Sequence, residues 1–176
     1  EAMEANTTGA SNTAVGQNAL TANTTGTRNT SLGARSGMQT TTGNYNAFFG
    51  YDAGESNTTA SSNTAVGDSS LRETTTGANN TAVGQSALLV NTTGSENTAV
   101  GTLALDANTT AANNTAVGYD SLSANTTGAS NTGLGDSALK ANTTASNNVA
   151  VGQSALLVNT TGASNVAVGA LALDAN

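Results

Sequence analysis

The feature that most constrains the fold of this chain is a repeat of seventeen residues. An Asn recurs at this interval from Asn12 to Asn165, and a Gly follows each one four residues later, from Gly16 to Gly169. No copy is lengthened or shortened. A short, fixed period is typical of a solenoid or a fibre. The sequence therefore predicts one repeat domain over 1–176, with ten coils that start at Asn12 and a partial coil before them.

Positions within the repeat, numbered 1 to 17 from this Asn, differ in how strictly their residue type is kept. Position 4 is always apolar, position 9 is Leu in all but two coils, positions 13 and 14 are Thr-Thr, and position 15 is Gly or Ala. Seventeen residues are too few for a repeat of two helices, which needs about 33. Thr, Val and Gly instead favour short strands joined by turns. The sequence predicts an all-β parallel β-solenoid, or β-roll.

Alternation along the first expected strand, positions 2 to 4, separates the repeat into two faces. Positions 2 and 4 share one face, and the Asn, position 3 and the Gly share the other. Position 2 becomes apolar at Ala47, Val149 and Val166, so we expect positions 2 and 4 to point inward. A second strand is expected over positions 8 to 11, with the Leu of position 9 also inward. The predicted core comprises Val15, Leu20, Val66, Leu71, Val83, Leu88, Val100, Leu105, Val117, Leu122, Leu134, Leu139, Val151, Leu156 and Val168.

Identical residues lie above one another in a parallel stack, which accounts for the constant Asn of position 1. Asn side-chain amides can hydrogen-bond along such a ladder. We interpret this column as structural rather than as a binding site. It comprises Asn12, Asn29, Asn46, Asn63, Asn80, Asn97, Asn114, Asn131, Asn148 and Asn165.

The small residues of position 3 suggest how the chain could associate with itself. One Val and one Leu per coil make a thin core, which oligomerisation often supplements. A solvent-facing column would tolerate bulk and charge, yet position 3 is almost always tiny. We therefore expect this face to pack against copies of itself around an axis. The predicted self-association face comprises Ala14, Ala65, Ala82, Ala99, Ala116, Ala150 and Ala167.

Two adjacent coils depart from the repeat at position 9, where Gly37 and Gly54 replace Leu. Losing two buried Leu side chains would leave a costly cavity. The same region holds Phe48 and Phe49, the only Phe residues in the chain. We expect volume compensation, and because the two rings lie on opposite faces of a strand, only one of them can fill the gap.

A longer period of 68 residues, or four coils, lies over the first. The segment 85–94 recurs unchanged at 153–162, which indicates duplication of a four-coil block. A surface that repeats in this way suits a spacer or a multivalent face.

Composition excludes several classes of function. The chain has no Cys and no His, so thiolate chemistry and a Ser-His-Asp triad cannot be built. Its net charge of −7, with only four Lys and Arg, argues against nucleic acid. No apolar run reaches the roughly 18 residues of a membrane span. Asp does not recur at the fixed steps of a calcium β-roll. We expect no enzyme activity, no cofactor, no metal site and no membrane insertion.

Two further roles can be considered for the polar columns. Asn-Thr-Thr is a glycosylation sequon at Asn23, Asn91, Asn108, Asn125, Asn142 and Asn159. We favour turn and ladder chemistry for this segment over glycan attachment. Stacked Thr could also bind ice, but a flat Thr-x-Thr face is the usual requirement. The Thr pairs here are adjacent and would point to opposite faces of a strand.

The motif Asn-Thr-Ala-Val-Gly-x-x-Ala-Leu resembles the repeat of YadA-type head domains in trimeric autotransporter adhesins, and similar repeats occur in bacteriophage fibre proteins. The resemblance covers all ten copies. It implies a left-handed parallel β-roll assembled as a homotrimer. The coil here is longer than in that family, with the extra residues assigned to the Asn-Thr-Thr-Gly segment, and the coiled-coil stalk and membrane anchor are not present in this sequence.

These observations lead to a hypothesis about function. The chain is expected to be a shaft or head segment of an extracellular adhesive fibre, on a cell surface or a virion. Its expected partners are itself and a host-surface or matrix ligand. An end-to-end structural filament is the first alternative, since the first and last residues of this sequence are ordinary repeat without a polar cap. An ice-binding solenoid is the second.

Overall fold

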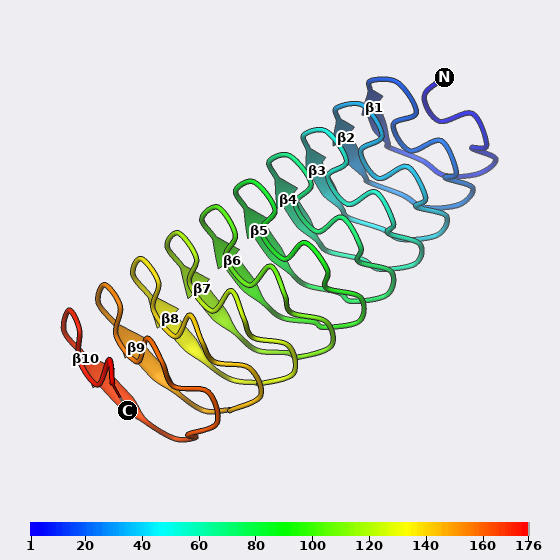
Figure 1. The fold of residues 1–176 in the computed structure, drawn as a ribbon. Helices are drawn as coiled ribbons and strands as arrows, with labels where there is room; N and C mark the ends of the chain where they lie inside the picture. The colour runs from blue at the N-terminus through cyan, green and yellow to red at the C-terminus, as the bar shows by residue number, and fades with distance from the viewer. Residues whose placement is uncertain (176) are drawn as a thin grey trace.

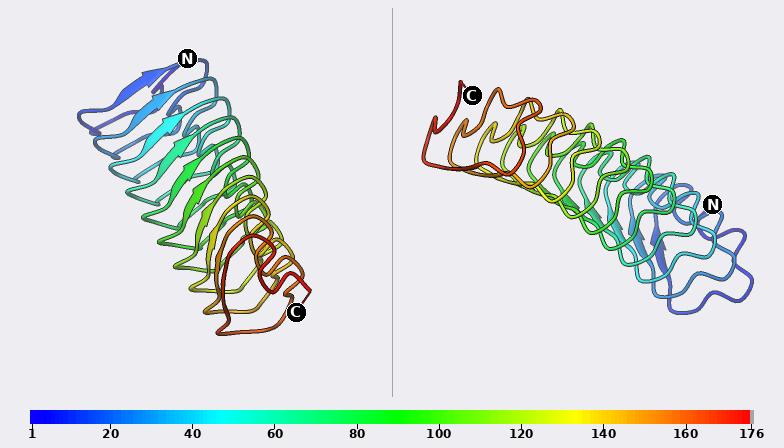
Figure 2. Two further views of the ribbon diagram at one scale, coloured as in Figure 1. Left: turned by 90° about the vertical axis from the view of Figure 1, so that its left-hand side faces the viewer. Right: turned by 90° about the horizontal axis from the view of Figure 1, so that it is seen from below.

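The computed structural model describes residues 1–175 as an elongated stack of coils with the two ends of the described chain at opposite ends of the rod (Figure 1, Figure 2). Each strand occupies positions 2 to 4 of the repeat. The strands form one ten-stranded sheet, parallel throughout and in chain order, so that each pairs only with the coils before and after it. The strands are β1 (Thr13–Val15), β2 (Thr30–Leu32), β3 (Ala47–Phe49), β4 (Thr64–Val66), β5 (Thr81–Val83), β6 (Thr98–Val100), β7 (Thr115–Val117), β8 (Thr132–Leu134), β9 (Val149–Val151) and β10 (Val166–Val168).

The register of the sheet places equivalent positions side by side. In β5 and β6, Thr81 pairs with Thr98 and Ala82 pairs with Ala99. The offset along the chain is seventeen residues at every step, which is the period of the sequence. The all-parallel β-solenoid that the sequence predicts is therefore the observed fold.

Each strand ends at the Gly of position 5 because no other residue fits there. Gly84 has a φ of +135°, and a Cβ on it would lie 2.5 Å from the carbonyl oxygen of Gly101 in the next coil. Such a contact is impossible without moving the backbone. Close stacking of coils and a left-handed backbone together explain why this Gly is present in every coil.

The second predicted strand, over positions 8 to 11, is wrong: this part of each coil is a series of turns. Ser86 at position 7 and Leu88 at position 9 have φ values of 57° and 51°. Residues in this left-handed region bend the chain and cannot extend a strand. Pairing between coils nonetheless continues, because Leu88 N donates to Ala104 O at 3.0 Å and Val90 N donates to Asp106 O at 3.2 Å.

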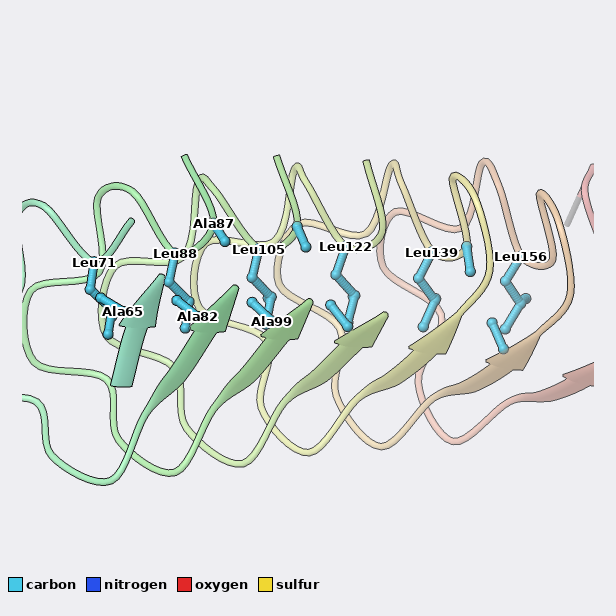
Figure 3. Packing of buried hydrophobic residues seen from close by; sticks show 14 of the residues in the cluster. Ala65, Leu71, Ala82, Ala87, Leu88, Ala99, Leu105, Leu122, Leu139 and Leu156 are labelled. Carbon is cyan, nitrogen blue, oxygen red and sulfur yellow. The ribbon is translucent and has the colours of Figure 1, made fainter. Parts of the chain in front are cut away.

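The core consists of positions 3, 8 and 9. Ala82, Ala87 and Leu88 are each 0 % exposed. Figure 3 shows the Leu side chains pointing toward the Ala residues of the strands, one row per coil. The Leu column is buried from Leu20 to Leu156 except where Gly replaces it. The enclosed space is narrow, so a small residue on the strand leaves room for the Leu that faces it.

The prediction that position 4 fills the core is wrong. These side chains point outward, with Val117 38 % and Val15 60 % exposed. Burial of Asn and Ala on the other side of the strand leaves position 4 on the surface, because successive side chains of a strand alternate between faces. The correction applies to Val15, Val66, Val83, Val100, Val117, Leu134, Val151 and Val168, all of which are exposed or half-buried.

The proposed self-association face is wrong for the same reason. The small residues of position 3 lie inside the coil and so cannot contact a second chain. The correction applies to Ala14, which is half-buried in the first strand, and to the buried residues Ala65, Ala82, Ala99, Ala116, Ala150 and Ala167. Position 3 is small because it faces Leu, not because it faces another chain.

Phe48 is the residue that compensates for the two missing Leu side chains. It occupies position 3 of β3 and is 1 % exposed. A Cβ on Gly37 would lie 2.7 Å from its Cδ2, and one on Gly54 would lie 2.5 Å from its Cε1. One ring thus occupies the Leu space of its own coil and that of the preceding coil, whereas Phe49 points outward and is 37 % exposed.

Replacing Phe48 by Ala should therefore destabilise the rod strongly. We expect Phe48→Ala to lower the free energy of unfolding by about 3–5 kcal/mol, as for other buried Phe residues. The triple variant Phe48→Ala/Gly37→Leu/Gly54→Leu restores the common repeat and should recover most of the loss. Urea unfolding followed by circular dichroism would measure both.

Phe49→Ala is the matched control, because it removes an identical ring from the outer face of the same strand. Its effect should be well below that of Phe48→Ala. A loss of equal size in the two single variants, or no recovery in the triple variant, would contradict the volume argument.

Candidate functional site

The Asn column of position 1 is a buried ladder that ties side chains to backbone. Asn131 N donates to Asn114 Oδ1 at 2.9 Å, and the Asn114 Nδ2 donates to Gly128 O, also at 2.9 Å. Equivalent bonds recur along the rod from Asn12 to Asn165. Each amide thus fixes the entry to one strand and the turn that leads to the next. With both ends of the side chain used in this way, the column has a structural role.

A second buried Asn ladder, at position 12, was not predicted as such. Asn142 Nδ2 donates to Asn125 Oδ1 at 2.9 Å and to Ala145 O at 3.0 Å. The constant Asn-Thr-Thr segment is the sequence feature that indicates this ladder, but it predicts turn and ladder chemistry only in general and does not single out the Asn. Here amide donates directly to amide, as in stacked Asn of other parallel assemblies.

Glycosylation of this column is excluded in the folded chain, because the amide nitrogens lie inside the coil and donate to other protein groups. The turn and ladder chemistry favoured for this segment is therefore what the fold shows, and the alternative of glycan attachment does not apply to it. The side chains concerned are at most 2 % exposed; they are Asn23, Asn91, Asn108, Asn125, Asn142 and Asn159.

The ladder of position 12 is interrupted where Thr40 and Thr74 replace Asn. The Oδ1 atoms of Asn23 and Asn57, which face these two residues, are buried and have no hydrogen-bond partner. A buried acceptor without a donor costs about 1–3 kcal/mol. The two interruptions are local defects in an otherwise continuous ladder.

Completing the ladder should stabilise the protein. We expect Thr74→Asn to raise the free energy of unfolding by about 1–3 kcal/mol, because the new amide can donate to Asn57 Oδ1. Thr76→Asn, at exposed position 14 of the same coil, is the control and should change stability by less than about 0.5 kcal/mol. Thermal and urea unfolding of the two variants would decide; equal effects would contradict the ladder argument.

The two Thr residues of each Thr-Thr pair differ in role. The hydroxyl of position 13 donates to the carbonyl of the next position 13, as from Thr126 Oγ1 to Thr143 O at 3.1 Å. Position 14 is exposed in every coil, as at Thr127. In these pairs the first Thr bonds to the next coil through its hydroxyl, whereas the second does so through its backbone, as from Thr127 N to Thr143 O at 3.3 Å.

The outer face of the sheet, made by positions 2 and 4 and called here the sheet face, is the most uniform surface of the molecule. Its position 2 residues are mostly Thr and its position 4 residues are Val, Leu or Phe. None of its residues is charged, although the chain carries a net charge of −7. In the described part of the chain, no hydroxyl of position 2 donates a hydrogen bond within the protein. The sheet face is therefore a long, narrow apolar strip edged by unbonded hydroxyls.

Charged side chains gather on positions 6, 7 and 10 of the turns, where they pair between neighbouring coils. Lys140 Nζ lies 2.7 Å from Asp120 Oδ2, and this hydrogen bond raises the pKa of Lys140. Arg35 pairs with Glu55 and, at 3.4 Å from its Nε, with Asp52 Oδ1. The pKa of Asp52 is raised, first by burial and then by the neighbouring Glu55. These pairs join adjacent coils and are not arranged around a cleft.

Within residues 1–175 no cation pairs with Asp106, and its Oδ1 is buried without a hydrogen-bond partner there. Burial is the main cause that raises its pKa above the ordinary value of 3.8, and Asp120 adds to it. A raised pKa means that the folded chain holds this proton more tightly than the unfolded chain does. Stability therefore falls as the pH rises through the window from 3.8 to the raised value.

Asp106→Asn should stabilise the protein at neutral pH, because the uncharged amide avoids the burial of a carboxylate. The gain should shrink as the pH falls toward 3.8 and vanish below it, where Asp106 is protonated in both states. Unfolding midpoints measured from pH 3 to pH 8 would test this. Asp136→Asn, at an exposed position, is the control, and an equal gain there would contradict the role of burial.

No group of three or more Asp or Glu side chains in residues 1–175 is placed to hold a metal ion. None of those residues forms a helix long and apolar enough to cross a membrane. Comparison of the chain with models of known protein families, with curated proteins and with solved structures found no match.

Proposed function

We propose that this chain is a segment of an extracellular adhesive fibre, at a cell surface or on a virion, and that it assembles as a parallel homotrimer of left-handed coils. The observation that carries the proposal is the sheet face. Its apolar column runs through all ten strands, from Val15 to Val168, without a charge. A long apolar strip on an otherwise polar rod is typical of a surface that another chain covers.

The dimensions of the sheet face suit such a contact. Ten strands spaced about 4.8 Å apart give a length of about 48 Å, and three residues give a width of about 10 Å. The resulting area of the sheet face is roughly 480 Å², of which the apolar column of position 4 is one part, and contiguous apolar patches of a few hundred Å² are often functional. In a parallel arrangement, equivalent coils of each chain lie at the same height, so that position 4 of one chain meets position 4 of the others.

The narrowness of the strip favours three chains over two. Only one column of the sheet face is strongly apolar, and a two-sheet sandwich buries a broader apolar surface. The position 4 columns of three chains can instead meet at one axis, with the Thr column of each chain at the edge of the contact. The proposed interface is thus position 4 in place of position 3, and the trimer is the one that the resemblance implies.

Mechanical strength and repetition support the fibre role. Inner coils are bonded to both neighbours through backbone, Asn and Thr groups, so that separating two coils breaks many bonds at once. The variable turn positions repeat every four coils, as in the identical segments 85–94 and 153–162. A fibre that presents the same surface several times gains avidity from weak individual contacts.

Light scattering of the purified chain would test the assembly. A mass of about 51 kDa, three times 17.1 kDa, is expected. Val117→Lys, which places a charge from each chain at the centre of the sheet face, should give a monomer. Thr110→Lys adds the same charge at exposed position 14 and should remain trimeric. A wild-type mass of 17.1 kDa would contradict the trimer, and very large assemblies would favour the end-to-end filament.

Ice binding is a second candidate, which the structure makes more reasonable than the sequence did. Thr98 and Val100 project from the same outer face of the sheet, with one such pair per coil, so the face is regular. The sequence argument against ice binding concerned only the adjacent Thr pairs. This role needs an open sheet face, so it requires a monomer and predicts thermal hysteresis that Val117→Lys removes.

A further inference from the structure

Position 17 of the repeat carries three residues larger than the usual Ser or Asn: Arg28, Tyr45 and Glu96. Its residues have positive φ, and seven of the ten are Ser or Asn. Arg28 and Tyr45, in successive coils, adopt φ values of 57° and 59°. Bulky side chains are costly in this region of backbone space, whereas Asn is tolerated.

The side chains of Arg28 and Tyr45 form one unit. The Arg28 Cζ lies 5.3 Å from the centre of the Tyr45 ring, and Arg28 Nη1 donates to Tyr45 Oη at 2.5 Å. Their backbones are held in neighbouring coils, because Arg28 N donates to Ala10 O and Tyr45 N donates to Thr27 O, each at 3.0 Å. The guanidinium is therefore positioned by the rod and by the ring next to it.

A hollow of about 210 Å³ lies beside Arg28 and is lined by Ala10, Ser11, Thr27 and Arg28. Ser11 occupies position 17 of the preceding coil, and its small side chain leaves the space open. The volume is that of about seven water molecules, enough for a single sugar ring. Hydroxyls of Ser11 and Thr27 line this space beside the guanidinium.

Arg35 provides an internal contrast. Its Cζ lies 5.9 Å from the centre of the Tyr51 ring, but its guanidinium is paired with Asp52 and Glu55. Arg28 has no carboxylate partner within the described residues 1–175. Of the two Arg–Tyr stacks, only that of Arg28 combines an unpaired cation with an adjacent hollow.

We propose that Arg28, Tyr45 and the adjacent hollow bind a carboxylated sugar unit of an acidic polysaccharide. The planar guanidinium can donate two parallel hydrogen bonds to a carboxylate. Tyr45 does not line the hollow; its ring and hydroxyl instead hold the guanidinium beside it, while the hydroxyls of the hollow match sugar hydroxyls. This ligand class deepens the adhesive function proposed above and rests on it for its biological meaning. The site itself lies within one chain.

Binding can be measured by calorimetric or NMR titration with glucuronate, using glucose and acetate as matched probes. Glucuronate should bind at least about tenfold more tightly than either, because it alone offers both the carboxylate and the ring. Arg28→Gln should weaken glucuronate binding by about 10- to 100-fold, since a charge-assisted bidentate contact is lost. Tyr45→Ser, which installs a residue common at this position, should also weaken it.

Arg72→Gln is the charge-matched control. The substitution removes the same charge from a coil distant from Arg28, where Arg72 pairs with its neighbour Glu73. It should leave glucuronate binding unchanged. Failure of saturable glucuronate binding, equal affinity for acetate, or equal effects of Arg28→Gln and Arg72→Gln would overturn the proposal. Circular dichroism and light scattering on every variant would separate a loss of this site from a loss of folding or of the proposed trimer.

Discussion

Hydrogen bonding between coils is the constraint on which the rest of the structure depends. An inner coil must satisfy donors and acceptors along both of its edges, because it has no other neighbours. Backbone pairing does this in the strand and, less regularly, through the turns, where Leu88 bonds to Ala104 and Thr92 to Thr109. Unpaired buried backbone groups are rare in proteins. A fixed seventeen-residue period follows, because an insertion within the paired part of a coil would displace its donors and acceptors from those of both neighbouring coils.

The two Asn columns extend this pairing into the interior. A coil of this size encloses too little apolar volume to consist of hydrophobic residues alone, and turns leave backbone groups that need partners inside. An Asn amide offers both a donor and an acceptor. Asn114 accepts from the next coil through Asn131 N and donates to a turn carbonyl of its own coil, Gly128 O. Asn125 donates to Asn108 of the preceding coil and to the same turn carbonyl. The interior is thus divided between a Leu-Ala row and two polar ladders.

The outside of the rod separates into surfaces with different tasks. The sheet face is uniform and uncharged, which suits contact with another regular surface. Charged residues are kept to the turns and to position 17, where each coil can vary without disturbing its neighbours. Arg28 and Tyr45 show what this freedom permits, since a local cluster replaces the usual small residues without altering the coil. Different positions of one repeat therefore have different roles: some build the regular coil, and those of the turns and position 17 form the variable surface.

The period, the parallel stack, the Leu column and the segregation of charge were determined by the sequence alone. A seventeen-residue repeat with Gly, Thr and Val permits few other folds. Which face of the strand points inward was decided only by the tertiary structure. Alternation in Thr81-Ala82-Val83 defines two faces but does not say which is inside, and a reversal moves every side chain to the other surface. Burial of Asn and Ala prevailed over burial of Val, because the interior is narrow and its turn carbonyls need amide donors. The period already places Arg28 beside Tyr45, seventeen residues later, but the stacking and hydrogen bond of the pair were shown only by the tertiary structure.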